Sequence, residues 1–402
     1  MADVAGAKGR PEDARRLDLD WIRIGAFALL ILYHVGMYYV PWDWHVKSAR
    51  RFEWLEPVMA LTNPWRLTLL FIVSGAASRF MLDKLGAGAF ARARTPRLLL
   101  PLGFGMLVVV PPQTWLQVAQ LNGQNTLPYG AFLIRYLTSN GGWSAGGVQI
   151  TTPTWNHLWF VAYLLVYTLL LSLACALWRS LPASTSAMAT RLASPAGICA
   201  PALWFVFVHL FLHPRFPESH ALWGDWTVHA ESAPAFLFGF AAAKAPALWT
   251  ALERRRRLLA VVAASSNLGY AGTLALVDAG IVPVPLGQPI MSWSFGSDQW
   301  FTAAAFLAYA SAYLCSFDHS WRRYLTEAIF PFYIAHQTII IGAAAVLRPL
   351  LLPAAVEAAV IVLVTVVGCL ATYEIARRVP LLRPFFGLKP KRGRVRPLAG
   401  NL

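Results

Sequence analysis

The sequence predicts an all-α membrane protein that crosses the bilayer about ten times, with both termini in the cytoplasm. Apolar residues make up 57% of the chain and charged residues only 13%, whereas soluble domains carry about a quarter charged residues. Apolar runs of about 20 residues, the length that a helix needs to span a bilayer, recur along the chain. Lys and Arg gather in alternate connections between these runs, as expected of cytoplasmic loops.

The predicted spans divide the chain into a transmembrane domain and two tails. The spans are placed at residues 20–40, 58–81, 98–116, 157–178, 195–212, 231–249, 258–279, 299–317, 328–347 and 355–376. A cytoplasmic tail is predicted at 1–19, the transmembrane domain at 20–377 and a basic cytoplasmic tail at 378–402. Between spans 3 and 4, residues 117–156 form a long polar insertion rich in Gly, Asn, Thr and Gln.

The net charge of +15 would suggest a nucleic-acid partner in a soluble protein. Here the charge follows the predicted topology, because most Lys and Arg residues fall in the inside segments. We therefore expect membrane lipids, and no nucleic acid, as partners.

The first span carries two ionisable residues in a suggestive register. Arg23 lies at its cytoplasmic edge and His34 lies deep within it. Eleven residues are about three helical turns, so both side chains project from one face, roughly 16 Å apart. Asp20 can pair with Arg23 at the i,i+3 spacing. An ionisable residue inside a span is a functional candidate, although Arg23 could also meet lipid headgroups and His34 could also pair within a helix bundle.

Further candidates lie at the edges of later spans. Arg94 and Arg97 precede span 3, where their guanidinium groups could hold phosphate, or could simply mark the inside of the membrane. His157 begins span 4 beside Trp159, which an interfacial aromatic belt would explain. His336 lies in the middle of span 9, where a hydrogen bond to a neighbouring helix is the simpler interpretation.

Several kinds of chemistry are missing from the sequence. It has no phosphate-binding glycine loop, no serine elbow and no paired-carboxylate motif, so a catalytic base would have to be histidine. Neither the histidines of the 213–230 region nor the cysteines have the spacing of a metal site, and we expect no metal and no bound cofactor. No internal repeat is visible, which argues against a secondary transporter.

Together these motifs resemble the acyltransferase family 3 membrane proteins over residues 17–377. The resemblance is carried by Arg23 and His34, by Ser74-Gly75, which would also permit close helix packing, by RARTPRLLLP before span 3, by HLWF at His157–Phe160 and by FPFYIAH at Phe330–His336. It implies an enzyme of the bacterial inner membrane that moves an acyl group, acetyl or succinyl, from cytoplasmic acyl-CoA to a hydroxyl of a periplasmic glycan.

The resemblance also implies roles for individual residues. His34 would be catalytic, while Arg23 and the arginines before span 3 would hold acyl-CoA as a co-substrate. His34 could act as a general base or could be acylated transiently. His336 or a Trp or Tyr donor could stabilise the oxyanion, and Arg66 could meet a succinyl carboxylate.

The outer insertion 117–156 and the loop 213–230 would shape acceptor selection, or would serve only as packing elements. The competing hypothesis is a proton-coupled transporter or flippase of a glycan or lipid precursor, with His34 as proton relay and Arg23 as gate. A purely structural membrane scaffold would leave the register of these two residues unexplained.

Overall fold

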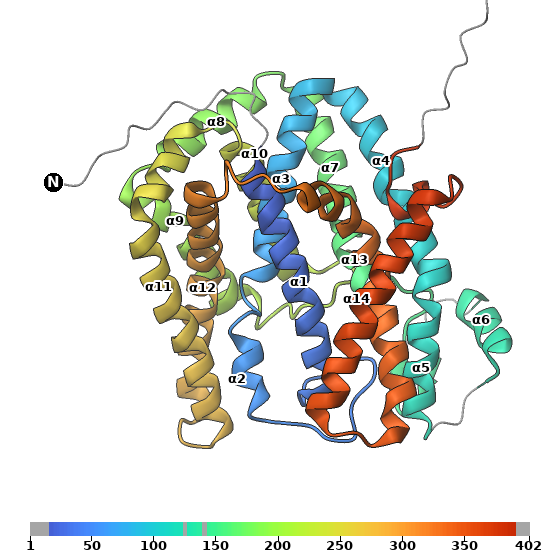
Figure 1. Cartoon of the computed structure of the whole chain (residues 1–402). Coiled ribbons are helices and arrows are strands. Elements are labelled where there is room, and N and C mark those ends of the chain that lie inside the picture. The colour runs from blue at the N-terminus through green and yellow to red at the C-terminus, as the bar shows by residue number, and fades with distance from the viewer. Residues whose placement is uncertain (1–15, 124–126, 139–142, 391–402) are drawn as a thin grey trace, which may run out of the picture. The chain divides into compact units, whose positions relative to one another are not determined.

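The computed structural model describes residues 16–123, 127–138 and 143–390, and in these residues the chain is almost entirely helical (Figure 1). The long helices are α1 (Leu17–Tyr39), α3 (Arg66–Leu85), α4 (Ala87–Phe104), α7 (Trp159–Leu177), α9 (Pro195–Phe207), α10 (Trp226–Ala242), α11 (Pro246–Asp278), α12 (Val284–Tyr313), α13 (Ser320–Leu347) and α14 (Ala354–Arg378). Shorter helices are α2 (Leu55–Ala60), α5 (Pro111–Leu121), α6 (Tyr129–Thr138) and α8 (Leu181–Arg191). The predicted helical fold class is confirmed.

Short irregular turns and one hairpin complete the described chain. Two π-helical turns are η1 (Gly105–Val109) and η3 (Val208–Leu212), and three 3₁₀ turns are η2 (Asn156–Leu158), η4 (Arg348–Leu350) and η5 (Pro384–Phe386). Strands β1 (Trp143–Ala145) and β2 (Val148–Ile150) pair antiparallel, with Ser144 opposite Gln149.

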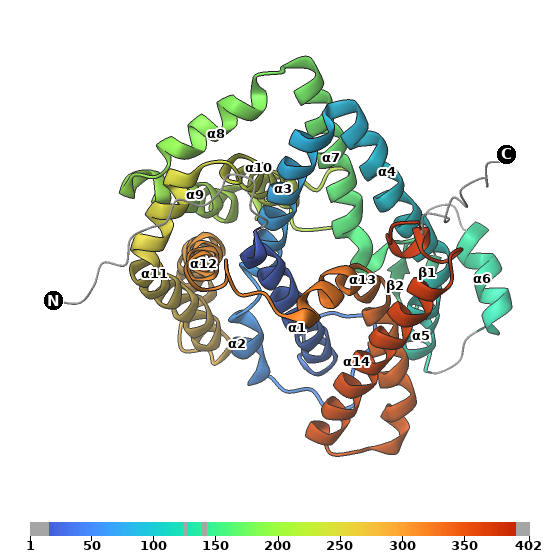
Figure 2. The same cartoon turned by 45° about the horizontal axis from the view of Figure 1, so that its top comes forward.

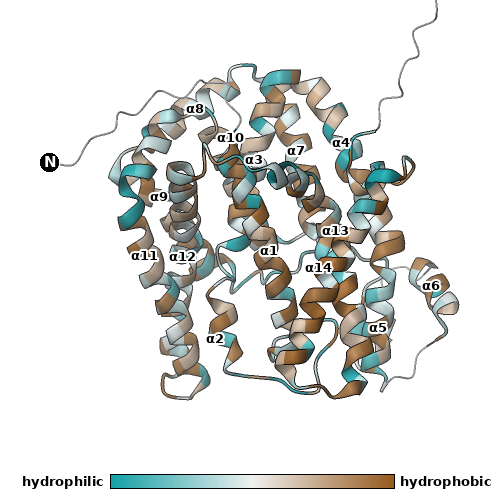
Figure 3. Cartoon of the chain, viewed as in Figure 1, coloured by the Kyte–Doolittle hydropathy of each residue, from teal (hydrophilic) through white to brown (hydrophobic). Residues whose placement is uncertain are grey.

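Seven described stretches are long and apolar enough to cross a membrane. They are Leu17–Tyr39, Ala87–Leu121, Asn156–Leu177, Pro195–Leu212, Pro246–Asp278, Ser320–Leu350 and Ala354–Arg378. In Figure 3 the last of these, α14, is shaded mostly brown for apolar residues. The seven coincide with seven of the ten predicted spans. The other three intervals, 58–81, 231–249 and 299–317, hold α3, α10 and α12.

These three helices differ from a simple apolar span for physical reasons. Helix α3 contains two buried arginines, Arg66 and Arg79. The predicted span 231–249 is broken at residues 243–245, between α10 and α11. Helix α12 begins at Val284, within the interval 280–298 that separates the predicted spans 258–279 and 299–317, and it buries Asp298 and Gln299. In α3 and α12, polar or charged side chains are buried within the protein, so hydropathy alone does not mark these helices as spans.

The described chain divides into two compact units, which are described separately. The first unit takes the described residues of Met1–Leu30, Trp54–Phe90 and Leu170–Thr326, and the second takes those of Ile31–Glu53, Ala91–Leu169 and Glu327–Leu402. Four of the five points at which the chain passes from one unit to the other lie inside helices, namely α1, α4, α7 and α13, and the fifth lies between residues 53 and 54.

The first unit is held together by close helix contacts. Helices α11 and α12 form a long hairpin, seen side by side in Figures 1 and 2. Helix α3 packs on α10 through a reciprocal glycine contact: a Cβ at Gly75 would lie 1.9 Å from the Phe236 carbonyl oxygen, and one at Gly239 would lie 1.8 Å from that of Ile72. The predicted close packing at Ser74-Gly75 is therefore found, because only glycine permits this backbone approach.

In the second unit the described residues of the predicted polar insertion 117–156 are largely folded, as helices and a hairpin. The chain continues past Pro111-Pro112 as α5, and α6 and the β-hairpin follow. Their apolar side chains form a small core of Val118, Phe132, Tyr136, Ala145 and Ile150. An amphipathic segment with a small core of its own looks polar on average, which is why composition concealed its structure.

The segment after α14 is also partly packed. Phe386 of η5 is buried and its ring lies 5.5 Å from that of Phe104 on α4, while Leu388 is buried as well. The predicted tail 378–402 therefore begins with a segment that packs in the second unit, and its residues 391–402 lie outside the described chain.

Candidate active site

Three histidines from different segments of the second unit meet around the middle of α13. His34 comes from α1, His157 from η2 before α7, and His336 from α13. The Nδ1 atom of His34 lies 2.9 Å from Nε2 of His336, and the two rings stack at 5.0 Å between centroids. The His157 ring meets His336 edge-on at 5.2 Å. Each was a candidate from sequence, but their meeting was not predicted.

The hydrogen-bond partner of His336 fixes the tautomer of His34. The Nδ1 atom of His336 lies 2.8 Å from the carbonyl oxygen of Tyr333. A carbonyl only accepts, so Nδ1 of His336 carries its hydrogen and Nε2 carries the lone pair. His34 must then donate from Nδ1, which leaves the lone pair of neutral His34 on Nε2. One backbone carbonyl thus decides, through His336, which nitrogen of His34 is basic.

His157 is held by similar neutral partners. Its Nε2–H donates to the carbonyl oxygen of Ile334 at 3.1 Å, and Nδ1 faces the Gln113 amide nitrogen at 3.5 Å. The hydroxyl of Tyr333 donates to the His157 carbonyl. These contacts use the N–H of neutral His157, so this residue is suited to holding α13 in place.

Gln113, at the start of α5, connects these elements. Its side chain is fully buried, and Nε2 donates to Thr338 Oγ1 at 2.6 Å in addition to facing His157. Its Oε1 accepts from Asn156 Nδ2 at 3.1 Å and from Gln337 Nε2 at 3.2 Å. The amide therefore uses its full hydrogen-bonding capacity. Sequence reasoning missed Gln113; the available signal was a polar residue directly after a double proline that ends an apolar run.

The double proline shapes the same region through the backbone. Pro111 has no N–H to donate to the preceding π-helical turn, η1. The Met106 carbonyl in η1 is instead contacted by the Tyr136 hydroxyl at 2.9 Å, and the Val109 carbonyl accepts from Thr338 at 2.8 Å. Side chains from α6 and α13 thus supply the donors that the prolines lack.

The loop after α1 folds back over the end of that helix. Trp44 stacks on His34 with 6.3 Å between ring centroids. The Lys47 ammonium donates to the carbonyls of Met37 and Trp42, each at 2.6 Å, and to that of Val40. A cation at the carbonyl end of a helix is favourable for the helix dipole, so Lys47 fixes the loop that covers His34.

Helix α5 holds this loop from another side. Gln117 Oε1 accepts from Nδ1 of His45 at 2.9 Å, and Gln120 bonds both the N–H and the carbonyl of Lys47 at 2.7 Å. Burial lowers the pKa of His45 from its ordinary value, which keeps this contact neutral. Gln113, Gln117 and Gln120 are spaced four and three residues apart, so they form one stripe on α5.

A buried carboxylate anchors the carbonyl end of α1. Glu357, in the first turn of α14, accepts hydrogen bonds from the hydroxyls of Tyr39 at 3.0 Å and Tyr38 at 3.3 Å. The amino end of a helix favours a negative charge. Tyr38 lies one turn after His34, so this contact positions that face of α1. Sequence reasoning missed Glu357, whose signal was a lone carboxylate in a strongly apolar run.

The remaining candidates of the second unit lie on two helices. Arg94 and Arg97 are half-buried on α4. Trp159 begins α7 and packs edge-on against Tyr163 at 5.3 Å.

Asp20, Arg23 and Arg66 belong to the first unit. Asp20 accepts a hydrogen bond from Arg322, a fully buried arginine that also bonds Asp318 at 2.9 Å. The predicted partner of Asp20 was Arg23, and Asp20 also interacts electrostatically with Arg23. Arg66 is buried and reaches the Thr62 carbonyl at 3.4 Å.

Within the described residues, no group of three or more His, Cys, Asp or Glu side chains is arranged to hold a metal ion. The chemistry that the histidine cluster itself offers is proton transfer at a fixed nitrogen.

Comparison with known proteins identifies the class of the chain. The family model of an acyltransferase domain, that of acyltransferase family 3, matches residues 16–374. The chain belongs to this family and is a membrane acyltransferase.

Its curated relatives include the glucans biosynthesis protein C of Salmonella paratyphi B and that of Salmonella heidelberg. Each is 26% identical over 157 residues, which cover 38% of this chain and 37% of the relative. The chain thus spans well under half the length of these relatives. No solved structure matches the chain.

Proposed function

We propose that the protein transfers an acetyl or succinyl group from cytoplasmic acyl-CoA to a hydroxyl of an extracytoplasmic glycan, with His34 as general base. The observation that carries this proposal is the His34–His336 contact, which leaves the basic nitrogen of His34 at Nε2. The name of the curated relatives, glucans biosynthesis protein C, makes a glucan the first acceptor to test.

In the proposed reaction, Nε2 of His34 removes the proton of the acceptor hydroxyl as its oxygen attacks the thioester carbonyl. The new C–O bond forms, the C–S bond breaks, and the proton passes from His34 to the departing thiolate of CoA. The positive charge that His34 carries in between is shared with His336, whose own N–H is directed at the Tyr333 carbonyl. A hydrogen-bonded chain of this kind is stronger than its separate parts.

The other candidates have supporting roles in this proposal. Because the N–H of neutral His336 already donates to Tyr333, we assign His336 to positioning and not to stabilising the oxyanion. Trp44, stacked on His34, offers an indole N–H for that purpose. Arg94 and Arg97 on α4, and Arg23 on α1, would hold the phosphates of acyl-CoA.

The proposed setting is the bacterial inner membrane, with ten spans and both termini in the cytoplasm. The distribution of Lys and Arg between loops supports it. Arg23 and His34 lie on one uninterrupted helix, α1, about 16 Å apart along its axis. This separation would let the nucleotide stay at the inner edge while the thioester reaches His34.

The test is binding and turnover of acetyl-CoA and succinyl-CoA by purified protein, comparing the wild type with His34→Ala. We expect the wild type to bind one donor and transfer its acyl group, and the variant to bind that donor without transfer. His319→Ala, which changes an exposed histidine of the first unit, is a matched control and should behave as the wild type.

Wild-type transfer by His34→Ala would overturn the role of His34. Failure of both proteins to bind any acyl-CoA, together with glycan movement across proteoliposomes in its absence, would favour a transporter instead.

A further inference from the structure

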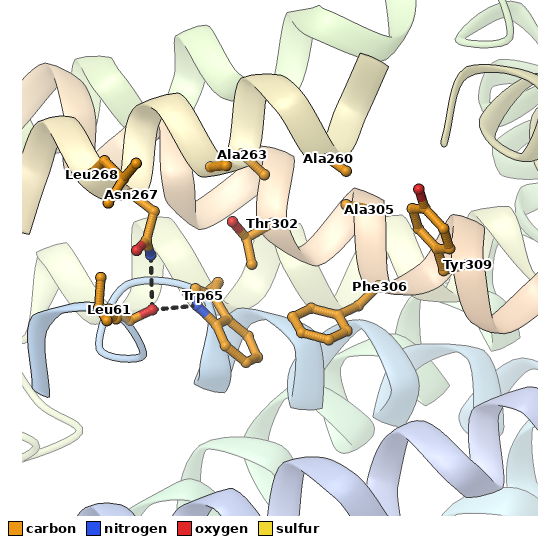
Figure 4. Close-up of a pocket in the computed structure, with 11 residues that line it drawn as sticks. Leu61, Trp65, Ala260, Ala263, Asn267, Leu268, Thr302, Ala305, Phe306 and Tyr309 are labelled. Atoms are coloured by element: carbon orange, nitrogen blue, oxygen red, sulfur yellow. Dashed lines mark hydrogen bonds between the residues drawn. The ribbon is translucent and has the colours of Figure 1, made fainter. Parts of the chain in front are cut away.

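A groove in the first unit runs between α11 and α12 and the segment that joins α2 to α3 (Figure 4). Its volume is about 510 Å³, which lies in the range of ligand-binding pockets. The lining residues are Leu61, Trp65, Ala260, Ala263, Ala264, Asn267, Leu268, Thr302, Ala305, Phe306 and Tyr309. Small alanines on both helices leave the space open, and the rings of Trp65 and Phe306, tilted against each other with their centroids 4.7 Å apart, form its floor.

The polar groups of this lining are largely used within the protein. The Asn267 amide donates to the Leu61 carbonyl at 2.7 Å and to Asp298 at 2.8 Å, and the Trp65 indole donates to the same Leu61 carbonyl at 2.9 Å. The Thr302 hydroxyl donates to Asp298. With these donors used, the lining suits a hydrocarbon chain and offers little to a sugar or nucleotide.

One end of the groove is marked by a cation. On α11 the lining continues a stripe with spacings of four, three and four residues: Arg256, Ala260, Ala263 and Asn267. On the antiparallel α12 the same spacings give Tyr313, Tyr309, Phe306 and Thr302. The two stripes meet at matching levels, and at their far end the Arg256 guanidinium lies 5.6 Å from the Tyr313 ring centroid.

The surroundings of Arg256 leave its charge available. Its Nη1 donates to the main-chain carbonyl of Glu253 at 2.8 Å, whereas the Glu253 carboxylate accepts from the Ser311 hydroxyl at 2.6 Å. Arg256 and Asn267 are eleven residues apart, so the stripe is about 16 Å long. That length fits a headgroup phosphate at Arg256 with an acyl chain running toward Asn267.

The outer face of α11 is exposed to its surroundings. Helix α11 is one of the stretches apolar enough to cross a membrane, and its Leu258, Val261 and Leu268 are each more than 60% exposed. In a membrane protein such side chains contact lipid. The groove therefore opens where acyl chains are the available occupants.

We propose that this groove binds an anionic phospholipid of the membrane, with one acyl chain between α11 and α12 and its phosphate at Arg256. The inference does not depend on the acyl donor, the acceptor or the role of His34. It assigns to Arg256 a contact with phosphate, which a planar guanidinium makes through two parallel hydrogen bonds.

The test measures lipid binding to the purified full chain in detergent by native mass spectrometry, titrating dioleoylphosphatidylglycerol or dioleoylglycerol. The second lipid has the same chains without phosphate. We expect the wild type to prefer phosphatidylglycerol, and Arg256→Gln to weaken that binding about fivefold while leaving the binding of dioleoylglycerol unchanged. Ala264→Trp, which fills the groove, should abolish the binding of both lipids at this site.

Two variants serve as matched controls. Arg257→Gln removes the neighbouring exposed arginine, and Val261→Trp adds the same bulk to an exposed position of α11 outside the lining. Both should bind phosphatidylglycerol as the wild type does. If Ala264→Trp fails to fold, Ala260→Leu provides a smaller obstruction and should reduce binding of both lipids.

The proposal is overturned if the wild type binds the two lipids equally, if Arg256→Gln and Arg257→Gln weaken binding to the same extent, or if a folded groove-filling variant binds as the wild type does.

Discussion

The buried histidines of the two units have partners of different charge. In the second unit, His34 contacts His336, and His336 in turn faces the backbone carbonyl of Tyr333, so the partners named here are an imidazole and a carbonyl. In the first unit, Nε2 of His209 lies 2.9 Å from Glu231 Oε1 and 3.2 Å from Gln299 Oε1. A carboxylate stabilises an imidazolium and so makes it a poor base. Neutral partners instead fix a tautomer and leave the histidine able to accept a proton.

In the first unit, a carboxyl group near His209, that of Glu218, also has a shifted pKa. Burial and the nearby Glu231 raise the pKa of Glu218 to about 7. The other charged or titratable groups facing Glu218 include His209, Asp225 and Arg66, with His220 at 3.8 Å. The residue type is the same in both units, but its partners decide whether the imidazole is held as a proton acceptor or balances a carboxylate.

The largest expected effect is on the rate of acyl transfer, and it should differ between the histidines of the two units. Because His34 supplies the proposed base, His34→Ala should lower the rate of acyl transfer about 10²- to 10⁴-fold. His209→Ala should leave the rate per folded molecule within a factor of two or three of the wild type. The measurement is acyl transfer normalised to correctly inserted protein. Equal losses in the two variants would remove the distinction between the units.

The next effect concerns the positioning of His34. His336→Phe keeps the ring stacking but removes the acceptor for His34 Nδ1–H, so kcat should fall about 10- to 100-fold while KM for the acyl donor stays unchanged. His336→Gln offers an acceptor oxygen and should restore part of kcat. Steady-state kinetics of both variants test this. A rise in KM without a fall in kcat would instead assign His336 to donor binding.

The sequence was informative about the fold class and the individual histidines, and less so about what joins them. His34 and His336 stand out because each is polar within an apolar run. Gln113 and Glu357 were missed because their roles depend on partners that are distant in the chain, namely Thr338 and the Tyr38-Tyr39 pair.

Three predicted spans illustrate the same limit at the level of helices. Hydropathy reports only how apolar a segment is. Helix α12 buries the polar residues Asp298 and Gln299, which hydrogen-bond to other protein groups. Its low mean hydropathy therefore does not reveal how much of the helix is buried. The break at residues 243–245, between α10 and α11, lies inside an apolar interval where composition alone does not locate an end.

A moderate effect on stability is expected from the Gln113 amide. Gln113→Leu has similar volume but leaves the half-buried Asn156 amide and the buried Gln337 amide without their shared acceptor, so it should lower the free energy of unfolding by about 1–3 kcal/mol. Gln117→Leu is the matched control, because Gln117 is only partly buried and makes one such contact. Thermal unfolding of both variants in detergent provides the comparison, and equal losses would contradict the role of Gln113.

The smallest effect is a pH dependence in the first unit. The pKa of Glu218 is about 7 in the folded protein against an ordinary value of 4.5, so the folded state binds the proton more tightly than the unfolded state does. Its contribution to stability is therefore present below about pH 4.5 and declines as the pH rises to about 7.

Glu218→Gln should flatten this decline, and only modestly, because the side chain is 37% exposed. The measurement is the midpoint of thermal unfolding between pH 4.5 and 8. An unchanged profile would show that the proton resides on another member of the cluster.

The three glutamines of α5 depend on a single rotational position of that helix. Gln113 contacts the histidine cluster, Gln117 contacts His45, and Gln120 holds the backbone of Lys47. A rotation of α5 by a single residue would turn all three amides away from their partners together. Helix α5 therefore positions the covering loop and the histidine cluster relative to each other, although none of its side chains takes part in the proposed chemistry.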